Sequence, residues 1–74
     1  MPKIPSVSAR ECIRAFEKAG FSVTRQSGSH VILHNGKGVR ISIPEHNPVS
    51  KGVLRGAIKD AGLTVEEFIT LLRS

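Results

Sequence analysis

Residues 28–30 form the segment of this chain that is best suited to acid–base chemistry. The run is Gly28-Ser29-His30, in which the glycine permits a tight turn and the serine offers a hydroxyl. Imidazole titrates close to neutral pH, so His30 could take the 2′-hydroxyl proton of RNA or protonate the leaving 5′-oxygen. Arg25 and Arg40 are its expected cationic neighbours and could stabilise the developing negative charge. The sequence indicates no second acid or base.

Two rows of basic side chains follow helical spacing and could contact phosphates. Each row places residues at i, i+4 and i+8, and the two rows are Arg10, Arg14 and Lys18, then Lys51, Arg55 and Lys59. Lys51 also lies beside the predicted N-terminus of a helix, whose free amides suit an anion. Contact with nucleic-acid phosphates and an ordinary solvated face are both consistent with such rows.

Three histidines, His30, His34 and His46, raise the question of a metal site. The chain has no H-E-x-x-H pattern and only one cysteine, so we expect no bound metal. It also has no G-x-S-x-G turn, no P-loop and no paired carboxylates near a glycine-rich turn. Most enzyme classes are therefore unsupported, and we expect no small-molecule cofactor.

The composition describes one small basic domain over residues 1–74. Eleven Lys and Arg against six Asp and Glu give a formal net charge of +5, which favours phosphate-bearing partners. Residues 1–44 carry seven basic and two acidic side chains, whereas residues 45–74 carry four of each. The single cysteine, Cys12, excludes an internal disulfide and suits a reducing cytosol, and no apolar run is long enough to span a membrane. We therefore expect a soluble, cytoplasmic protein.

The elements that must position His30 can be predicted from hydrophobic periodicity and turn residues. A capping-box spacing at Ser8 opens a helix that Gly20 ends, after an extended lead-in over residues 1–7. Short strands are expected over Phe21–Gln26, Ser29–His34 and Val39–Ile43. A second helix is expected over about Lys51–Ala61, N-capped by Ser50, with an apolar stripe of Val53, Leu54, Ala57, Ile58 and Ala61. A short third helix is expected from Thr64 to about Leu72, which gives an α+β order of α-β-β-β-α-α.

The register of the last two strands follows from which residues must be buried. If Val31 and Leu33 share a face with the apolar residues of the third strand, paired positions must sum to an even number, which requires an odd-numbered loop. A two-residue Asn-Gly hairpin would place Val31 opposite Arg40 and is rejected. We therefore predict a three-stranded antiparallel sheet with the helices on one face, and His30 on the other face, opposite or near Ser42.

Together these segments resemble the HicA toxin family over nearly the whole chain. The features that carry the resemblance are Gly28-Ser29-His30, Pro44-Glu45-His46, Lys51-Gly52-Val53-Leu54-Arg55 and Gly62-Leu63-Thr64-Val65-Glu66-Glu67-Phe68, in this order. The resemblance implies a double-stranded-RNA-binding-domain-like fold and cleavage of mRNA independently of the ribosome. It also implies neutralisation by a HicB-type antitoxin that covers the active site. By position, the family's catalytic histidine is His30, and His46 matches a second histidine that could be structural.

Three functions are open at this point. The leading hypothesis is an endoribonuclease toxin that uses His30 as general acid or base, with RNA contacts from Ser29, Arg25, Arg40, Arg10, Arg14, Lys18, Lys51 and Arg55. The second is a non-catalytic double-stranded-RNA-binding module, in which His30 is one polar group on an open sheet face. The third is a protein-interaction domain whose basic surface serves an acidic partner.

Overall fold

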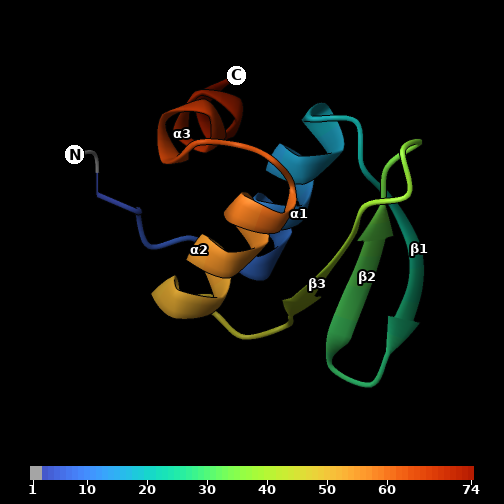
Figure 1. The fold of residues 1–74 in the computed structure, drawn as a ribbon. Helices are drawn as coiled ribbons and strands as arrows, with labels where there is room; N and C mark the ends of the chain where they lie inside the picture. Colours follow the sequence, from blue (N-terminus) through green and yellow to red (C-terminus); the bar gives the residue numbers. More distant parts are fainter. Residues whose placement is uncertain (1–2) are drawn as a thin grey trace.

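The computed structural model describes residues 3–74, and its elements follow the predicted order (Figure 1). Within this range the elements are α1 (Ala9–Lys18), β1 (Ser22–Ser27), β2 (His30–His34), β3 (Arg40–Pro44), α2 (Lys51–Asp60) and α3 (Val65–Arg73). The strand boundaries lie within one residue of the predicted ones. The periodicity of the sequence therefore suffices to locate every element.

The helix α1 begins and ends where its capping residues predict. The Ser8 hydroxyl accepts a hydrogen bond from the backbone N–H of Glu11, and the Glu11 carboxylate accepts one from the N–H of Ser8. Gly20 follows the helix with a φ of 101°, after which the N–H of Phe21 donates to the carbonyl of Phe16. The two phenyl rings meet edge to face with centroids 6.0 Å apart. Phe21 thus folds back onto the last turn of α1.

The sheet is an antiparallel meander in the order β1-β2-β3. Val31 pairs with Ile43 and Leu33 pairs with Ile41, so paired positions sum to an even number and the predicted register is confirmed. The Asn35 side chain closes the loop between β2 and β3 by accepting two backbone hydrogen bonds from within it. The loop therefore reinforces the register that burial requires.

All three helices lie on one side of the sheet, and the core fills the space between the two layers (Figure 1). The helix α2 packs on β3, and α1 packs on β1, β3 and α3. The largest fully buried side chains are Phe16, Phe68, Leu33, Ile43, Leu54 and Cys12. The rings of Phe16 and Phe68, with centroids 5.2 Å apart, join α1 to α3. This architecture is the double-stranded-RNA-binding-domain-like α+β fold, with one face of the sheet left open.

The helix α2 differs from prediction in one buried residue and one cap. Val53 is 42% exposed, because the buried side of α2 is formed by Leu54, Ala57 and Ile58, and Val53 lies about 100° around the helix from Leu54. Its predicted burial was wrong. Ser50 occupies the N-cap position, but its side chain makes no capping hydrogen bond.

The described part of the N-terminal lead-in contributes to the core. Ile4 and Val7 are buried, and the carbonyl of Val7 accepts a hydrogen bond of 2.8 Å from the N–H of Val49. This contact holds the segment before α1 against the segment before α2. The first two residues of the predicted lead-in lie outside the described residues.

Candidate active site

His30 is exposed on the sheet face that carries no helices. It is the first residue of β2, where it pairs with Ser27 of β1 and Pro44 of β3. Successive side chains of a strand point to opposite faces, and the neighbouring Val31 belongs to the core, so His30 points away from the helices. Ser42 lies one pair further along the same face, diagonally across from His30. The predicted face of His30 and its proximity to Ser42 are confirmed.

Hydrogen bonds tie the turn before His30 to the end of β3. Gly28 has a φ of 58°, a left-handed conformation that favours glycine. The carbonyl of Ser29 accepts a hydrogen bond of 2.6 Å from the N–H of Glu45. The side-chain amide of Gln26 donates both to the Gly28 carbonyl and to the Glu45 carboxylate. These contacts fix the backbone from which the His30 imidazole projects.

A β-bulge places Arg25 on the same face as His30. In β1, Val23 pairs with Leu33, but the next paired residue is Arg25, opposite Ile32, because the register shifts between Val23 and Arg25. With a regular ladder Arg25 would lie opposite Val31 and face the helices. The shift instead makes Arg25 a diagonal neighbour of His30, at about 7 to 8 Å between backbones, which its long side chain can span. The sequence pattern did not predict this bulge.

Arg40 is not a neighbour of His30, which corrects the expectation that both arginines flank it. Arg40 pairs with His34 at the opposite end of β2. His34 lies four positions along the strand from His30, or roughly 13 Å at about 3.3 Å per residue. Arg25 is therefore the cation that the fold brings to His30, and Arg40 belongs to the other end of the same face.

Ile32 forms a buried centre of the open face. It is 4% exposed but lies outside the main core cluster, because its side chain points away from the helices. Its cross-strand partners are Arg25 and Ser42, and its neighbours along β2 on this face are His30 and His34. These side chains must shield it from water, so the stems of polar residues pack over an apolar centre.

Among residues 3–74, the paired strands place no carboxylate on the open face. The register places on it Ser22, Arg25, Ser27, His30, Ile32, His34, Arg40, Ser42 and Pro44, and the bulged Thr24 contacts it through its hydroxyl. Glu45 follows β3 directly, but its carboxylate is bonded to Gln26 and lines a groove on the helix side. The paired strands therefore place two arginines and two imidazoles on this face, and the carboxylate of Asp60 on α2 lies beside Arg40 at its edge, so the net positive charge favours an anionic ligand.

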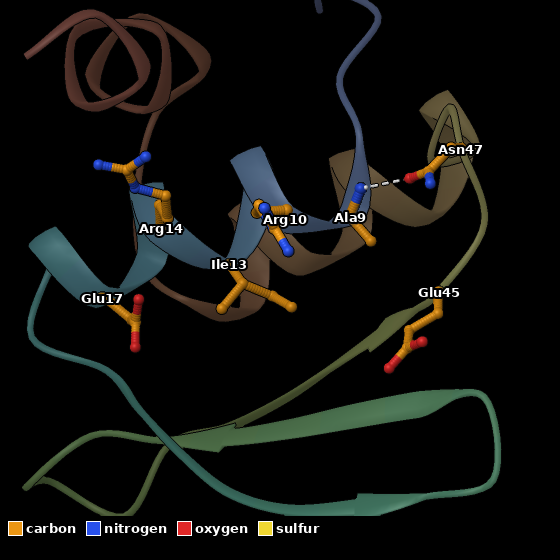
Figure 2. Close-up of a pocket in the computed structure, with 7 residues that line it drawn as sticks. All are labelled: Ala9, Arg10, Ile13, Arg14, Glu17, Glu45 and Asn47. Atoms are coloured by element: carbon orange, nitrogen blue, oxygen red, sulfur yellow. Dashed lines mark hydrogen bonds between the residues drawn. The ribbon is translucent and has the colours of Figure 1, made fainter.

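The first basic row lies on the other side of the sheet. Arg10 and Arg14 line an open groove of about 570 Å³ between α1 and the segment that follows β3 (Figure 2). Figure 2 shows Glu17 pointing from α1 toward the strands, Glu45 pointing into the same space, and Arg14 pointing away from the strands. The groove thus mixes both signs of charge and does not include His30.

The remaining predicted cations are also distant from His30. The Lys18 ammonium donates to the carbonyls of Leu71 and Ser74, so it is engaged with the end of α3. Lys51 and Arg55 are exposed on α2, which packs on β3 from the helix side. The structure brings Arg25 to His30 but leaves the helix rows on the opposite side of the molecule.

The other chemically capable side chains do not form a second centre. Cys12 is fully buried, and this burial raises the pKa of its thiol to about 12, which keeps it protonated and unreactive. Among residues 3–74, no three His, Cys, Asp or Glu side chains are grouped so that they could hold a metal ion. His46 is exposed in the connection between β3 and α2. Over the same residues, no helix has the length and apolar character needed to cross a membrane.

Comparison with known proteins places the chain in a family. A search of curated proteins finds no match. The family model described as the HicA toxin of bacterial toxin-antitoxin matches residues 9–63 of the 74-residue chain, from the start of α1 to just beyond α2, including the whole sheet and His30. Because the match covers most of the chain, this protein belongs to the HicA toxin family, whose members act as the toxins of toxin–antitoxin pairs and have a cognate antitoxin.

Proposed function

We propose that this toxin is an endoribonuclease that cleaves mRNA in the cytoplasm without the ribosome, with His30 as its single general acid or base and no cofactor. The observation that carries the proposal is the setting of His30. Its imidazole is exposed, its backbone is held by the turn contacts to Glu45, and Arg25 lies one pair away on a face without carboxylates. An approaching phosphodiester therefore meets a proton-transfer group and a cation together.

The reaction uses a nucleophile that RNA itself supplies. The 2′-oxygen attacks the adjacent phosphorus as His30 takes its proton, the bond from phosphorus to the 5′-oxygen breaks, and that oxygen leaves as a hydroxyl after accepting a proton from water. The protonated His30 then returns its proton to the solvent. The products are a 2′,3′-cyclic phosphate and a 5′-hydroxyl end. The guanidinium of Arg25 stabilises the extra negative charge on the pentacoordinate phosphorus. No carboxylate on the open face opposes that charge.

Cleavage of a purified long RNA tests this assignment. We expect His30→Ala to lose cleavage while its circular dichroism spectrum and its affinity for RNA are largely kept, because His30 is exposed. His46→Ala is the matched control, since it removes another exposed imidazole that lies outside the paired strands, and it should cleave at close to the rate of the unaltered chain. Equal losses in the two variants would overturn His30 as the single acid or base.

A substrate change tests the nucleophile separately. Replacing the 2′-hydroxyl at the cleaved nucleotide by hydrogen should stop cleavage and leave binding almost unchanged. If the deoxy substrate is cut at the ribonucleotide rate, the proposed mechanism is wrong. If the unaltered chain binds RNA but never cleaves it, the protein is a binding module instead.

We also propose that the cognate antitoxin is of the HicB type and inhibits by covering the open face. That face carries Arg25 and Arg40 with no carboxylate among them, so an acidic partner surface would complement it. Adding the antitoxin at equimolar amounts should abolish cleavage. Arg25→Glu should weaken the complex, whereas Lys59→Glu on the exposed side of α2 should not. Equal weakening by both variants would overturn this location.

A further inference from the structure

Three polar side chains gather at the end of the open face that is distant from His30. We call Thr24, His34 and Arg40 the His34 cluster. The hydroxyl oxygen of Thr24 lies 2.7 Å from Nδ1 of His34 and 3.3 Å from the carbonyl oxygen of Ile32. The register places Arg40 directly opposite His34, at the end of β3 that adjoins the loop. The proposed cleavage mechanism uses none of these residues.

The contact with Thr24 determines what the His34 ring can offer a ligand. A threonine hydroxyl carries one hydrogen, and its contact with Nδ1 is much shorter than its contact with the carbonyl of Ile32. We therefore assign that hydrogen to the bond with Nδ1, which leaves the proton of the neutral imidazole on Nε2. A protonated imidazole also carries a hydrogen on Nε2. In both states the free nitrogen of His34 is a hydrogen-bond donor.

The neighbour of His34 adds a charged donor. Directly opposed residues in antiparallel strands have Cβ atoms about 4.5 to 5.5 Å apart, so the Arg40 guanidinium and the His34 ring can contact the same group. No carboxylate of the paired strands faces Arg40, although Asp60 of α2 lines the same groove beside β3. Two donors on directly opposed residues of one sheet face are suited to a phosphate oxygen.

We propose that the His34 cluster binds a phosphate of the RNA strand that flanks the scissile phosphate held at His30. The cluster lies roughly 13 Å from His30 along β2, which is too far for one phosphate to reach both rings. The substrate is thus an RNA strand laid along β2, with its cleaved bond at the first residue and a second phosphate at the last. This inference rests on the proposed ribonuclease function for the identity of the ligand.

Neutralising single phosphates tests the cluster. The probes are RNA oligonucleotides with one mapped cleavage site and one uncharged methylphosphonate linkage, moved stepwise away from that site in both directions. For the unaltered chain, a methylphosphonate at one flanking position should raise KM by about tenfold, which is the effect expected for losing a hydrogen bond to a charged group. The same linkage should leave kcat unchanged. Arg40→Gln and His34→Ala should each raise KM for the unmodified RNA by a similar factor and no longer respond to that linkage. Lys37→Gln is the matched control, because it removes an exposed charge from the loop beside β3 and should respond to the linkage as fully as the unaltered chain.

The inference is overturned if the effect of each substitution and the effect of the uncharged linkage are additive. If the methylphosphonate that raises KM for the unaltered chain raises KM a further tenfold for Arg40→Gln and His34→Ala, neither residue contacts the flanking phosphate. Failure of the proposed function would look different, because no oligonucleotide would be cleaved at all. The affinities of the same protein variants for the same oligonucleotides can then be compared by fluorescence anisotropy. Non-additive binding losses would still support the cluster, and additive losses or no binding would overturn it.

Discussion

Arg25 of β1 and Arg40 of β3 lie beside opposite ends of β2, so the same substitution at each should have a different kinetic effect. Arg25 is diagonal to His30, whereas Arg40 lies opposite His34, roughly 13 Å further along the strand. Arg25→Gln and Arg40→Gln each remove one positive charge from the same exposed face. The charge that develops on the phosphorus at His30 should therefore depend on the first residue and not on the second.

Coulomb's law gives the size of the expected difference. At about 6 Å, a guanidinium and a unit negative charge attract by about 0.7 kcal/mol in bulk water and by about 3 kcal/mol at an effective dielectric constant of about 20. Arg25→Gln should therefore lower kcat roughly three- to hundredfold. At about 13 Å the attraction is about 0.3 kcal/mol in bulk water and about 1.3 kcal/mol at an effective dielectric constant of about 20, and salt at about 0.1 M, with a Debye length of about 10 Å, screens most of it. Arg40→Gln should change kcat less than twofold and act on KM.

Single-turnover cleavage, with the protein in saturating excess over the RNA, measures this difference most directly. Lys37→Gln removes one charge from the loop between β2 and β3, so it controls for the lower net charge of the protein. The effect of Arg25→Gln should shrink as salt is raised, because its charge is exposed. If Arg25→Gln and Arg40→Gln lower the rate of the chemical step equally, the register-based assignment of Arg25 to the reacting phosphate is refuted.

Three further predictions concern the stability of the scaffold. Phe68→Ala should cost about 3 to 5 kcal/mol, a large part of the roughly 4 to 11 kcal/mol expected for a chain of this size, and thermal unfolding by circular dichroism should show a much lower Tm. Cys12 should react with a thiol reagent only when the protein opens. The labelling rate should therefore level off above pH 9, near the pKa of the unfolded thiol, and should not continue to rise toward pH 12; labelling at the rate of a free thiol would contradict its burial. Hydrogen bonds from the backbone N–H and the hydroxyl of Ser8 lower the pKa of Glu11 below 4.5, so its stabilisation is present above pH 4.5 and is lost as pH falls through the lowered value. The Tm difference between the unaltered chain and Glu11→Gln should therefore shrink in acid, and a constant difference would exclude this linkage.

The position of His30 could be predicted because buried and exposed residues alternate along most of β3, and the buried ones must share a face with Val31 and Leu33 of β2. This alternation fixes the parity of the pairing but not its shift. A pairing of His30 with Ser42 has the same parity as the observed pairing with Pro44, and it would have placed Arg40 one pair from His30. The hydrogen bonds within the loop, centred on Asn35, accompany the register that moves Arg40 away. Sequence parity therefore identified the correct face and the wrong neighbour.

The strand β1 was harder to predict because every one of its residues is exposed, so burial imposes no alternation on it. Its bulge nevertheless determines the composition of the site. The extra residue, Thr24, turns Arg25 toward His30, and its own hydroxyl then contacts Ile32 and His34. A bulge disrupts ladder hydrogen bonds, and the disruption costs least in an edge strand, where water can satisfy the freed groups. One irregularity in the strand that contributes least to the core thus orients polar side chains at both ends of the open face, while the buried strands keep the regular pairing on which the fold depends.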